Sequence, residues 1–126
     1  MNRHEIRERL VFSVYQHLLL KKDMNSTVVD SFNVESALEL DEYVLNVAKT
    51  VEDNEKTFIE QIGTHLKRWN FNRLNYIDQA ILLVSAAELK LAVNDKAIII
   101  DEAINLAKKY SDDDAYKYIN GVLDQL

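Results

Sequence analysis

The sequence predicts an all-α fold, and three observations carry that prediction. Apolar residues recur every three or four positions along most of the chain, which is the spacing of one helix face. The 126 residues include no proline and only two glycines, whereas hairpin-rich β folds draw on both for their turns. Apolar residues make up 48% of the chain, so it can bury a core without a metal or disulfide.

The N-terminal half is predicted to hold three helices. Their apolar stripes place them at residues 3–22, 34–50 and 54–69; the stripe residues are Ile6, Leu10, Val14 and Leu18, then Ala37, Leu38, Leu45 and Ala48, then Phe58, Ile59, Ile62 and Leu66. Residues 24–33 lack a sustained period and are rich in Asn, Asp and Ser. They are predicted to be mostly loop, with a short helical turn as the alternative, and Asn33 is expected to cap the second helix.

Three further helices are predicted after a link at residues 70–74. Asn75 and Asp78 have capping-box spacing before a strongly apolar helix that reaches about residue 91. The next helix covers about residues 95–110; its β-branched start is compatible with a strand, but the later Ala and Ile spacing favours helix. Ser111 and Asp114 form a second candidate capping box before the last helix. Gly121 lies inside that helix, where we expect it to permit close packing or contact.

Composition argues against an enzyme. The chain has no cysteine and no paired glycines, which excludes thiol catalysis, sulfur-based zinc sites and glycine-rich phosphate loops. The histidines His4, His17 and His65 do not have metal-ligand spacing, so neither metal nor cofactor is expected. Adjacent acidic residues point in different directions on a helix and do not form a catalytic dyad. No apolar run approaches the length that spans a bilayer, and a cytoplasmic protein is the expectation.

The net charge of −6 is unevenly distributed. Residues 1–22 carry +3, residues 23–62 carry −8, residues 63–77 carry +3 and residues 78–126 carry −4. Ordinary surface scatter would also produce such a pattern. The two basic stretches are nevertheless short and local, so a negative total does not exclude contact with RNA phosphates.

Cations and aromatic rings occur together in three places. Arg3, His4 and Arg7 open the first predicted helix, and the spacing of the two arginines places them on one face. Lys67, Arg68 and Arg73 flank Trp69 and Phe71, and residues 116–118 read Tyr-Lys-Tyr. Such mixtures hold single-stranded RNA through phosphates and stacked bases. The alternatives are hinge packing for Trp69 and Phe71, and a core position for Tyr118.

The sequence resembles the NusB family of bacterial transcription antitermination factors. Residues 100–110 read IDEAINLAKKY and residues 115–124 read AYKYINGVLD, which is similar to the C-terminal signature of that family. Residues 78–83 read DQAILL and lead to Glu88 and Leu89, as in its central helix. Residues 3–9, RHEIRER, followed by Tyr15, resemble its arginine-rich opening.

The resemblance implies two helical bundles packed as subdomains of a single domain, residues 1–69 and 70–126, with about six or seven helices. It implies a non-enzymatic protein that pairs with a small-subunit ribosomal protein, NusE. The pair is expected to bind boxA-type single-stranded RNA in ribosomal RNA leader transcripts. It would act there within the RNA polymerase antitermination complex.

Site residues follow from the resemblance position by position. The expected RNA contacts are Arg3, His4, Arg7, Lys117 and Tyr118. The expected contacts with the ribosomal protein are Tyr15, Asp78 and Asp114. Three positions depart from the family pattern: Glu5 stands where relatives often have a base, Leu83 where many have arginine, and Phe12 where a polar residue is common.

Two alternatives remain open from the sequence. A helical protein-interaction adaptor without direct RNA binding would also explain the acidic excess. A homodimer is the second, because some relatives self-associate through the RNA surface. The expected RNA-binding mechanism joins the first helix and the start of the last helix into one surface, with the acidic remainder facing a basic partner.

Overall fold

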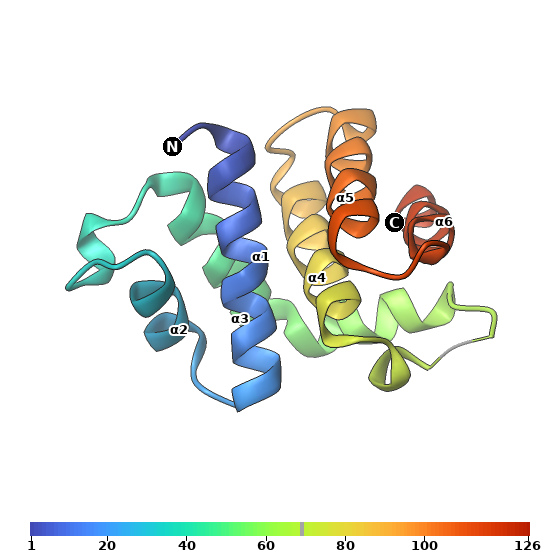
Figure 1. Cartoon of the computed structure of the whole chain (residues 1–126), viewed down its shortest axis with the longest axis horizontal. Coiled ribbons are helices and arrows are strands. Elements are labelled where there is room, and N and C mark those ends of the chain that lie inside the picture. Colours follow the sequence, from blue (N-terminus) through green and yellow to red (C-terminus); the bar gives the residue numbers. More distant parts are fainter. Residues whose placement is uncertain (69) are drawn as a thin grey trace.

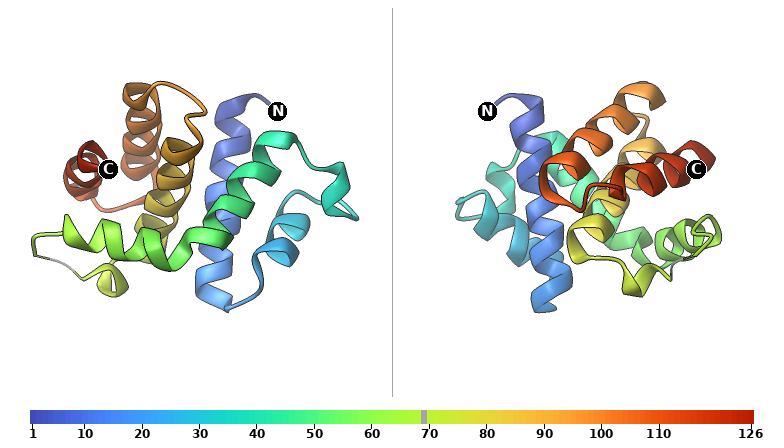
Figure 2. Two further views of the ribbon diagram at one scale, coloured as in Figure 1. Left: turned by 180° about the vertical axis from the view of Figure 1, so that it is seen from behind. Right: turned by 45° about the vertical axis from the view of Figure 1, so that its right-hand side comes forward.

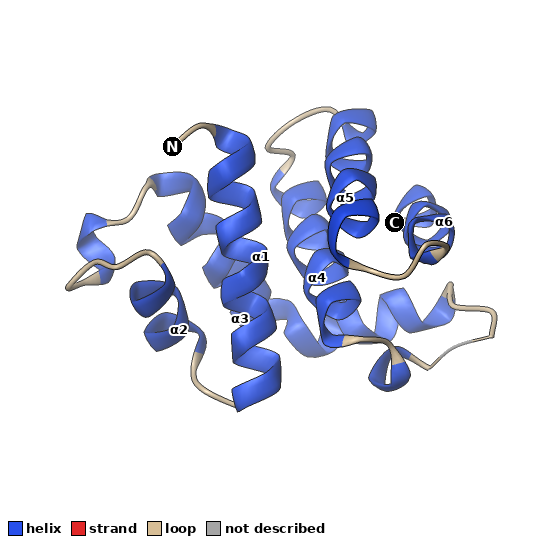
Figure 3. Ribbon diagram, in the orientation of Figure 1, coloured by secondary structure: helices blue, strands red, loops and turns tan. Residues whose placement is uncertain are grey.

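A computed structural model describes residues 1–68 and 70–126, and within these ranges it is helical with no strand (Figure 3). The six α-helices are α1 (Arg3–Leu20), α2 (Met24–Ser31), α3 (Glu42–Thr64), α4 (Tyr76–Leu91), α5 (Lys96–Tyr110) and α6 (Ala115–Gln125). Two short 3-10 helices are η1 (Ala37–Glu39) and η2 (Phe71–Arg73). Among the described residues no helix is both long and apolar enough to cross a bilayer. The all-α prediction is therefore confirmed.

Helix α4 is the centre of the molecule. It lies beside α1 and packs against α3, α5 and α6, and α2 packs on the outer side of α1 (Figure 1). Seen from behind, α3 crosses both α1 and α4 (Figure 2). One continuous apolar core includes residues from all six helices. In α4 every residue from Asp78 to Glu88 is buried, which explains why its sequence is so uniformly apolar.

The first helix forms as predicted, and Glu5 has a structural role at its start. The Asn2 side chain accepts a hydrogen bond from the Glu5 backbone N–H at 2.9 Å, and the Glu5 carboxylate accepts one from the Asn2 N–H at 3.2 Å. This is a capping box, which satisfies backbone donors at the helix start. The acidic departure at Glu5 thus stabilises the helix that presents the N-terminal basic residues.

The prediction that residues 24–33 are mostly loop is wrong, because eight of them form α2. The Asp23 carboxylate caps this helix by accepting a hydrogen bond from the Ser26 N–H at 2.8 Å. Met24 and Val28 are buried on one side of α2. Two buried apolar residues and a cap are enough to stabilise so short a helix. The sequence therefore shows no long periodic apolar stripe there.

The prediction of two separate helices at residues 34–50 and 54–69 is also wrong. One uninterrupted helix, α3, replaces most of both, and its buried stripe includes Val47, Val51, Phe58 and Ile62. It is capped by Asp41 rather than by Asn33. Residues 37–39 instead form η1, and Leu38, predicted to be in the core, is 94% exposed. The predicted end of the third helix at Trp69 lies outside the described residues.

The predicted C-terminal helices are confirmed, but their predicted capping boxes are not. Neither Asn75 nor Asp114 makes a side-chain cap bond at the start of its helix. Ser111 ends α5 instead of opening α6, because its N–H donates to the Ala107 carbonyl at 2.8 Å. Gly121 lies inside α6 as expected, yet a Cβ there would meet no atom within 4 Å, so close packing does not require glycine.

His17 ties the end of α1 to α3 and makes stability depend on pH. Its Nε2 lies 2.8 Å from the Glu55 carboxylate and its Nδ1 lies 2.6 Å from the Lys22 carbonyl. Both partners only accept, so both ring nitrogens need a proton. The hydrogen bond to Glu55 accordingly raises the pKa of His17.

We expect this stabilisation to be complete below the ordinary histidine pKa of about 6.5 and to vanish as pH rises through the raised folded pKa. Its size should be up to about 1 kcal/mol in the free energy of unfolding. Urea unfolding at a series of pH values, from below about 6.5 to above the raised pKa of His17, measures this change in the free energy of unfolding. His17→Gln should flatten that part of the profile, and Glu55→Gln is the matched variant. An unchanged profile in both would contradict the assignment.

Candidate functional site

A buried ion pair holds the start of α1 against the end of α4. The Arg7 Nε donates to both Glu88 carboxylate oxygens at 3.1 and 2.9 Å, and its Nη2 lies 2.7 Å from Glu88 Oε2. The Tyr43 hydroxyl, from α3, donates to the same Oε2 at 2.8 Å. Arg7 is 4% exposed and Glu88 1% exposed. Three helices therefore meet at one carboxylate.

The surroundings of this pair keep Arg7 charged and the Tyr43 hydroxyl protonated. Burial alone would lower the pKa of Arg7, but the Glu88 carboxylate outweighs it and raises that pKa. Burial and the same carboxylate raise the pKa of the Tyr43 hydroxyl, which stays protonated and donates. The Arg7 guanidinium faces the interior, so a direct contact with RNA would require this ion pair to open.

Arg3 and His4 lie next to this ion pair and are exposed. The Arg3 guanidinium carbon lies 4.0 Å from the centroid of the Tyr43 ring, a cation–π contact. The His4 Nδ1 lies 2.7 Å from the Glu102 carboxylate on α5. Arg7 also approaches Glu102, at 3.5 Å. We call Arg3, His4, Arg7, Tyr43 and Glu88 the α1 cluster; it presents the Arg3 guanidinium and the His4 ring to solvent above a buried pair.

A second group, the α6 cluster, consists of Asp78, Asp114, Lys117 and Tyr118. The Tyr118 hydroxyl donates to Asp78 Oδ2, and burial together with this bond raises the pKa of Tyr118. Asp78 is 1% exposed, so a protein partner could contact it directly only if the residues that cover it moved. Lys117 and Asp114 are exposed and pair with each other at 3.3 Å.

Removing the Tyr118 hydroxyl should destabilise the fold. Within the described residues Asp78 Oδ1 is buried without a hydrogen-bond partner, so Tyr118→Phe would leave the carboxylate with none. We expect the free energy of unfolding to fall by about 1–3 kcal/mol. Urea unfolding measures this, and Tyr116→Phe is the control. A decrease equal to that of the control would mean that the Asp78 bond contributes nothing.

The two clusters lie at opposite ends of α4. Asp78 begins that helix and Glu88 lies near its end, ten residues or about 15 Å further along. The first and last helices therefore present their basic residues at two separate places along α4. Arg3 and His4 are brought together with Arg7, and Lys117 with Tyr118, but the two groups do not touch through any contact among the described residues.

The middle of α1 forms the surface between the clusters. Phe12 packs edge-on against Tyr110 of α5, with ring centroids 4.9 Å apart. The Tyr110 hydroxyl and the Lys109 ammonium donate to the Glu8 carboxylate at 2.8 and 3.1 Å. Tyr15 is half-buried against the core, with the remainder of its surface accessible to a partner. The departure at Phe12 is thus accommodated by an aromatic contact between α1 and α5.

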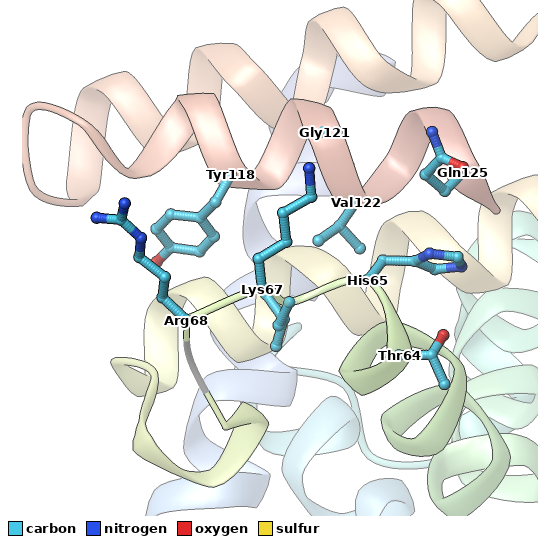
Figure 4. Close-up of a pocket in the computed structure, with 9 residues that line it drawn as sticks. Thr64, His65, Lys67, Arg68, Tyr118, Gly121, Val122 and Gln125 are labelled. Carbon is cyan, nitrogen blue, oxygen red and sulfur yellow. The ribbon is translucent and has the colours of Figure 1, made fainter.

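A pocket of about 580 Å³ lies beside the α6 cluster, between the C-terminal end of α3 and α6 (Figure 4). Tyr118 and Gly121 line it from α6, and Lys67 and Arg68 line it from the segment after α3. The sequence singled out these two cations for their mixture with aromatic residues. Their aromatic neighbour in the structure is Tyr118, which is distant in sequence. The role expected of Trp69 lies outside the described residues.

Comparison with known proteins identifies the family. A model of the NusB family matches residues 4–126. The chain belongs to the NusB family. The transcription antitermination protein NusB of Macrococcus caseolyticus is 35% identical, covering 100% of this chain and 96% of that protein. The protein of the same name from Staphylococcus carnosus is 34% identical, covering 100% and 99%.

Solved structures agree with the NusB fold. T. maritima NusB superposes with a TM-score of 0.86 at 23% identity, covering 99% of this chain and 89% of that one. A structure of antitermination factors NusB and NusE in complex with dsRNA superposes with a TM-score of 0.79 at 24% identity, covering 99% and 96%. NusB membership confirms the predicted family, fold class and function as a transcription antitermination factor that is not an enzyme.

The sequence did not reveal the buried partners of this NusB chain. Glu88 and Tyr43 were not predicted to meet Arg7, although Glu88 interrupts an apolar helix and so carried a signal of a paired charge. Glu102, which contacts both His4 and Arg7, was not predicted to take part either. Leu83 was predicted to depart from the family pattern. Its side chain is 0% exposed, so it is part of the core and cannot contact a partner directly.

Proposed function

We propose that this chain binds RNA together with a small-subunit ribosomal protein, NusE, and recognises boxA-type single-stranded RNA in ribosomal RNA leader transcripts. It would do so within the RNA polymerase antitermination complex. The observation that carries the proposal is the pair of clusters in which exposed cations stand beside aromatic rings held by buried carboxylates. Likeness in fold to a complex of NusB and NusE with dsRNA supports it.

Each site residue then has a defined part in RNA binding. Arg3 and Lys117 neutralise phosphates, His4 contacts the RNA beside Arg3, and the Tyr118 ring offers a surface for a base. Arg7 is a positioning residue, because its pair with Glu88 holds the turn that carries Arg3 and His4. Its substitution would act on RNA only through the fold.

The partner surface is proposed to use Tyr15 and Asp114, with electrostatic support from the acidic segment. Residues 23–62 carry −8, which complements a basic ribosomal protein and would speed its association. Asp78 contributes indirectly, by fixing Tyr118 near that surface.

Fluorescence anisotropy with labelled boxA-type RNA, with and without purified NusE, tests the proposal. We expect tighter RNA binding when NusE is present, and weaker binding as salt rises. Lys117→Ala should weaken binding and reduce the salt dependence, while Lys49→Ala, an exposed lysine on α3 paired with Asp53, should not. Equal affinity with and without NusE would contradict the adaptor mechanism.

The second candidate is a protein-interaction adaptor without direct RNA contact, favoured by the net charge of −6. It predicts that NusE binds this chain while Arg3→Ala, His4→Ala and Lys117→Ala leave the RNA affinity of the pair unchanged. Sedimentation of the free chain, with and without RNA, tests self-association. A homodimer through the RNA surface would dissociate when RNA is added.

A further inference from the structure

Cations line the pocket between the segment after α3 and α6, and none of the described residues that line it is a carboxylate. Lys67 and Arg68 contribute the positive charge of the lining. In residues 1–68 and 70–126, neither Lys67 nor Arg68 takes part in an ion pair. In a chain of net charge −6, such a concentration of unpaired cations around a concave surface of about 580 Å³ favours an anionic ligand.

The α6 side of the pocket is flat and open. Gly121 has no side chain, and a Cβ built there would meet nothing within 4 Å. The Tyr118 ring lies one turn earlier on α6, and its hydroxyl is anchored on Asp78, which fixes the orientation of the ring. Figure 4 shows the Lys67 side chain extending from its loop toward α6 near Gly121. An anchored ring, a bare stretch of helix and long cationic side chains suit a planar group that carries a phosphate.

We infer that this pocket takes one nucleotide of the bound single-stranded RNA, with the base against Tyr118 and the Gly121 surface and the phosphates at Lys67 and Arg68. The inference rests on the proposed function. It assigns the RNA a course from Lys117 along α6 toward the end of α3. The strand then leaves the α6 cluster on the side away from the α1 cluster, which lies at the other end of α4.

Gly121→Leu tests the assignment without weakening the fold. Leucine is a better helix former than glycine, and its side chain would enter open space in the pocket. We expect the thermal unfolding midpoint to stay level or rise, while boxA-type RNA binding in the presence of NusE weakens at least about fivefold, as when one base can no longer stack. Gly121→Ala places only a methyl group in the pocket, so it should weaken RNA binding less than Gly121→Leu does. Lys49→Ala, which lies away from the pocket, is the control and should bind RNA as the wild type does.

The phosphate contacts are tested separately by salt dependence. The double variant Lys67→Ala, Arg68→Ala should lower the slope of log K against log salt by about 0.7 for each RNA phosphate that these two cations neutralise in the wild type. Lys49→Ala, on the N-terminal half of α3 and away from the pocket, should leave the slope unchanged.

The outcomes separate this inference from the proposed function. Absence of RNA binding by the wild type with NusE would overturn both. Wild-type binding that Gly121→Leu and the double variant leave unchanged would overturn only the pocket assignment. Adenosine triphosphate added as a competitor distinguishes a site for free nucleotides. If it saturates the pocket while Gly121→Leu has no effect on RNA, the pocket serves a free nucleotide and the inference is wrong.

Discussion

Replacing Arg7 by alanine is expected to lower the free energy of unfolding by about 3–5 kcal/mol. The Glu88 carboxylate is 1% exposed and would lose its only cation at hydrogen-bond distance in the described chain, keeping the Tyr43 hydroxyl alone. An unpaired buried charge accounts for the size of the effect. Equilibrium urea unfolding followed by circular dichroism measures it.

Two variants make the Arg7 result interpretable. Arg3→Ala removes an exposed cation from the same cluster and should change stability by less than about 1 kcal/mol. Arg7→Met combined with Glu88→Leu removes both charges, and the double variant should be far more stable than Arg7→Ala alone. If Arg7→Ala were as stable as the wild type while losing RNA affinity, a direct RNA contact would replace the positioning role.

Replacing Leu83 by arginine should unfold this chain or destabilise it by about 5 kcal/mol or more. Leu83 is 0% exposed and belongs to the apolar core around α4. A guanidinium there would lose its hydration without a partner placed to receive it. Far-UV circular dichroism and urea unfolding of Leu83→Arg report the result.

Matched substitutions distinguish charge from volume at this position. Leu83→Met preserves the volume and should lower stability by less than about 1.5 kcal/mol, whereas Leu83→Ala leaves a cavity and should lower it by about 2–5 kcal/mol. A stable, folded Leu83→Arg variant would show that the surrounding helices can rearrange to expose this site.

Helices with a long apolar stripe could be predicted from the sequence, and the others could not. Residues 76–91 and 96–110 have such stripes, and α4 and α5 formed there. The predicted helices left a gap at residues 51–53, but Val51 and Phe58 continue the buried stripe of α3 across it, while Glu52 and Asp53 are exposed and Glu55 faces His17 of α1. Periodicity of the buried side, rather than local polarity, decides where a helix continues.

The candidate site was predictable in its residue types but not in its connections. Arg3 and Arg7 share a face of the helix as expected, yet the position of α4 buries Arg7 and leaves Arg3 exposed. Likewise Asp78 has capping-box spacing, but in the packed structure it accepts a hydrogen bond from the Tyr118 hydroxyl and not from a backbone N–H. Contacts between residues 40 or more positions apart depend on how helices pack, which local spacing does not record.

The long sequence separation within the α1 cluster has a consequence for biosynthesis. Arg7 finds its carboxylate 81 residues later in the chain, and the Tyr43 hydroxyl reaches the same group across 45 residues. While the protein is being translated, α1 leaves the ribosome with an arginine on its inward face and no counter-ion for it. The N-terminal half therefore cannot complete its packing until α4 has emerged, so the chain reaches its native state late in synthesis rather than half by half.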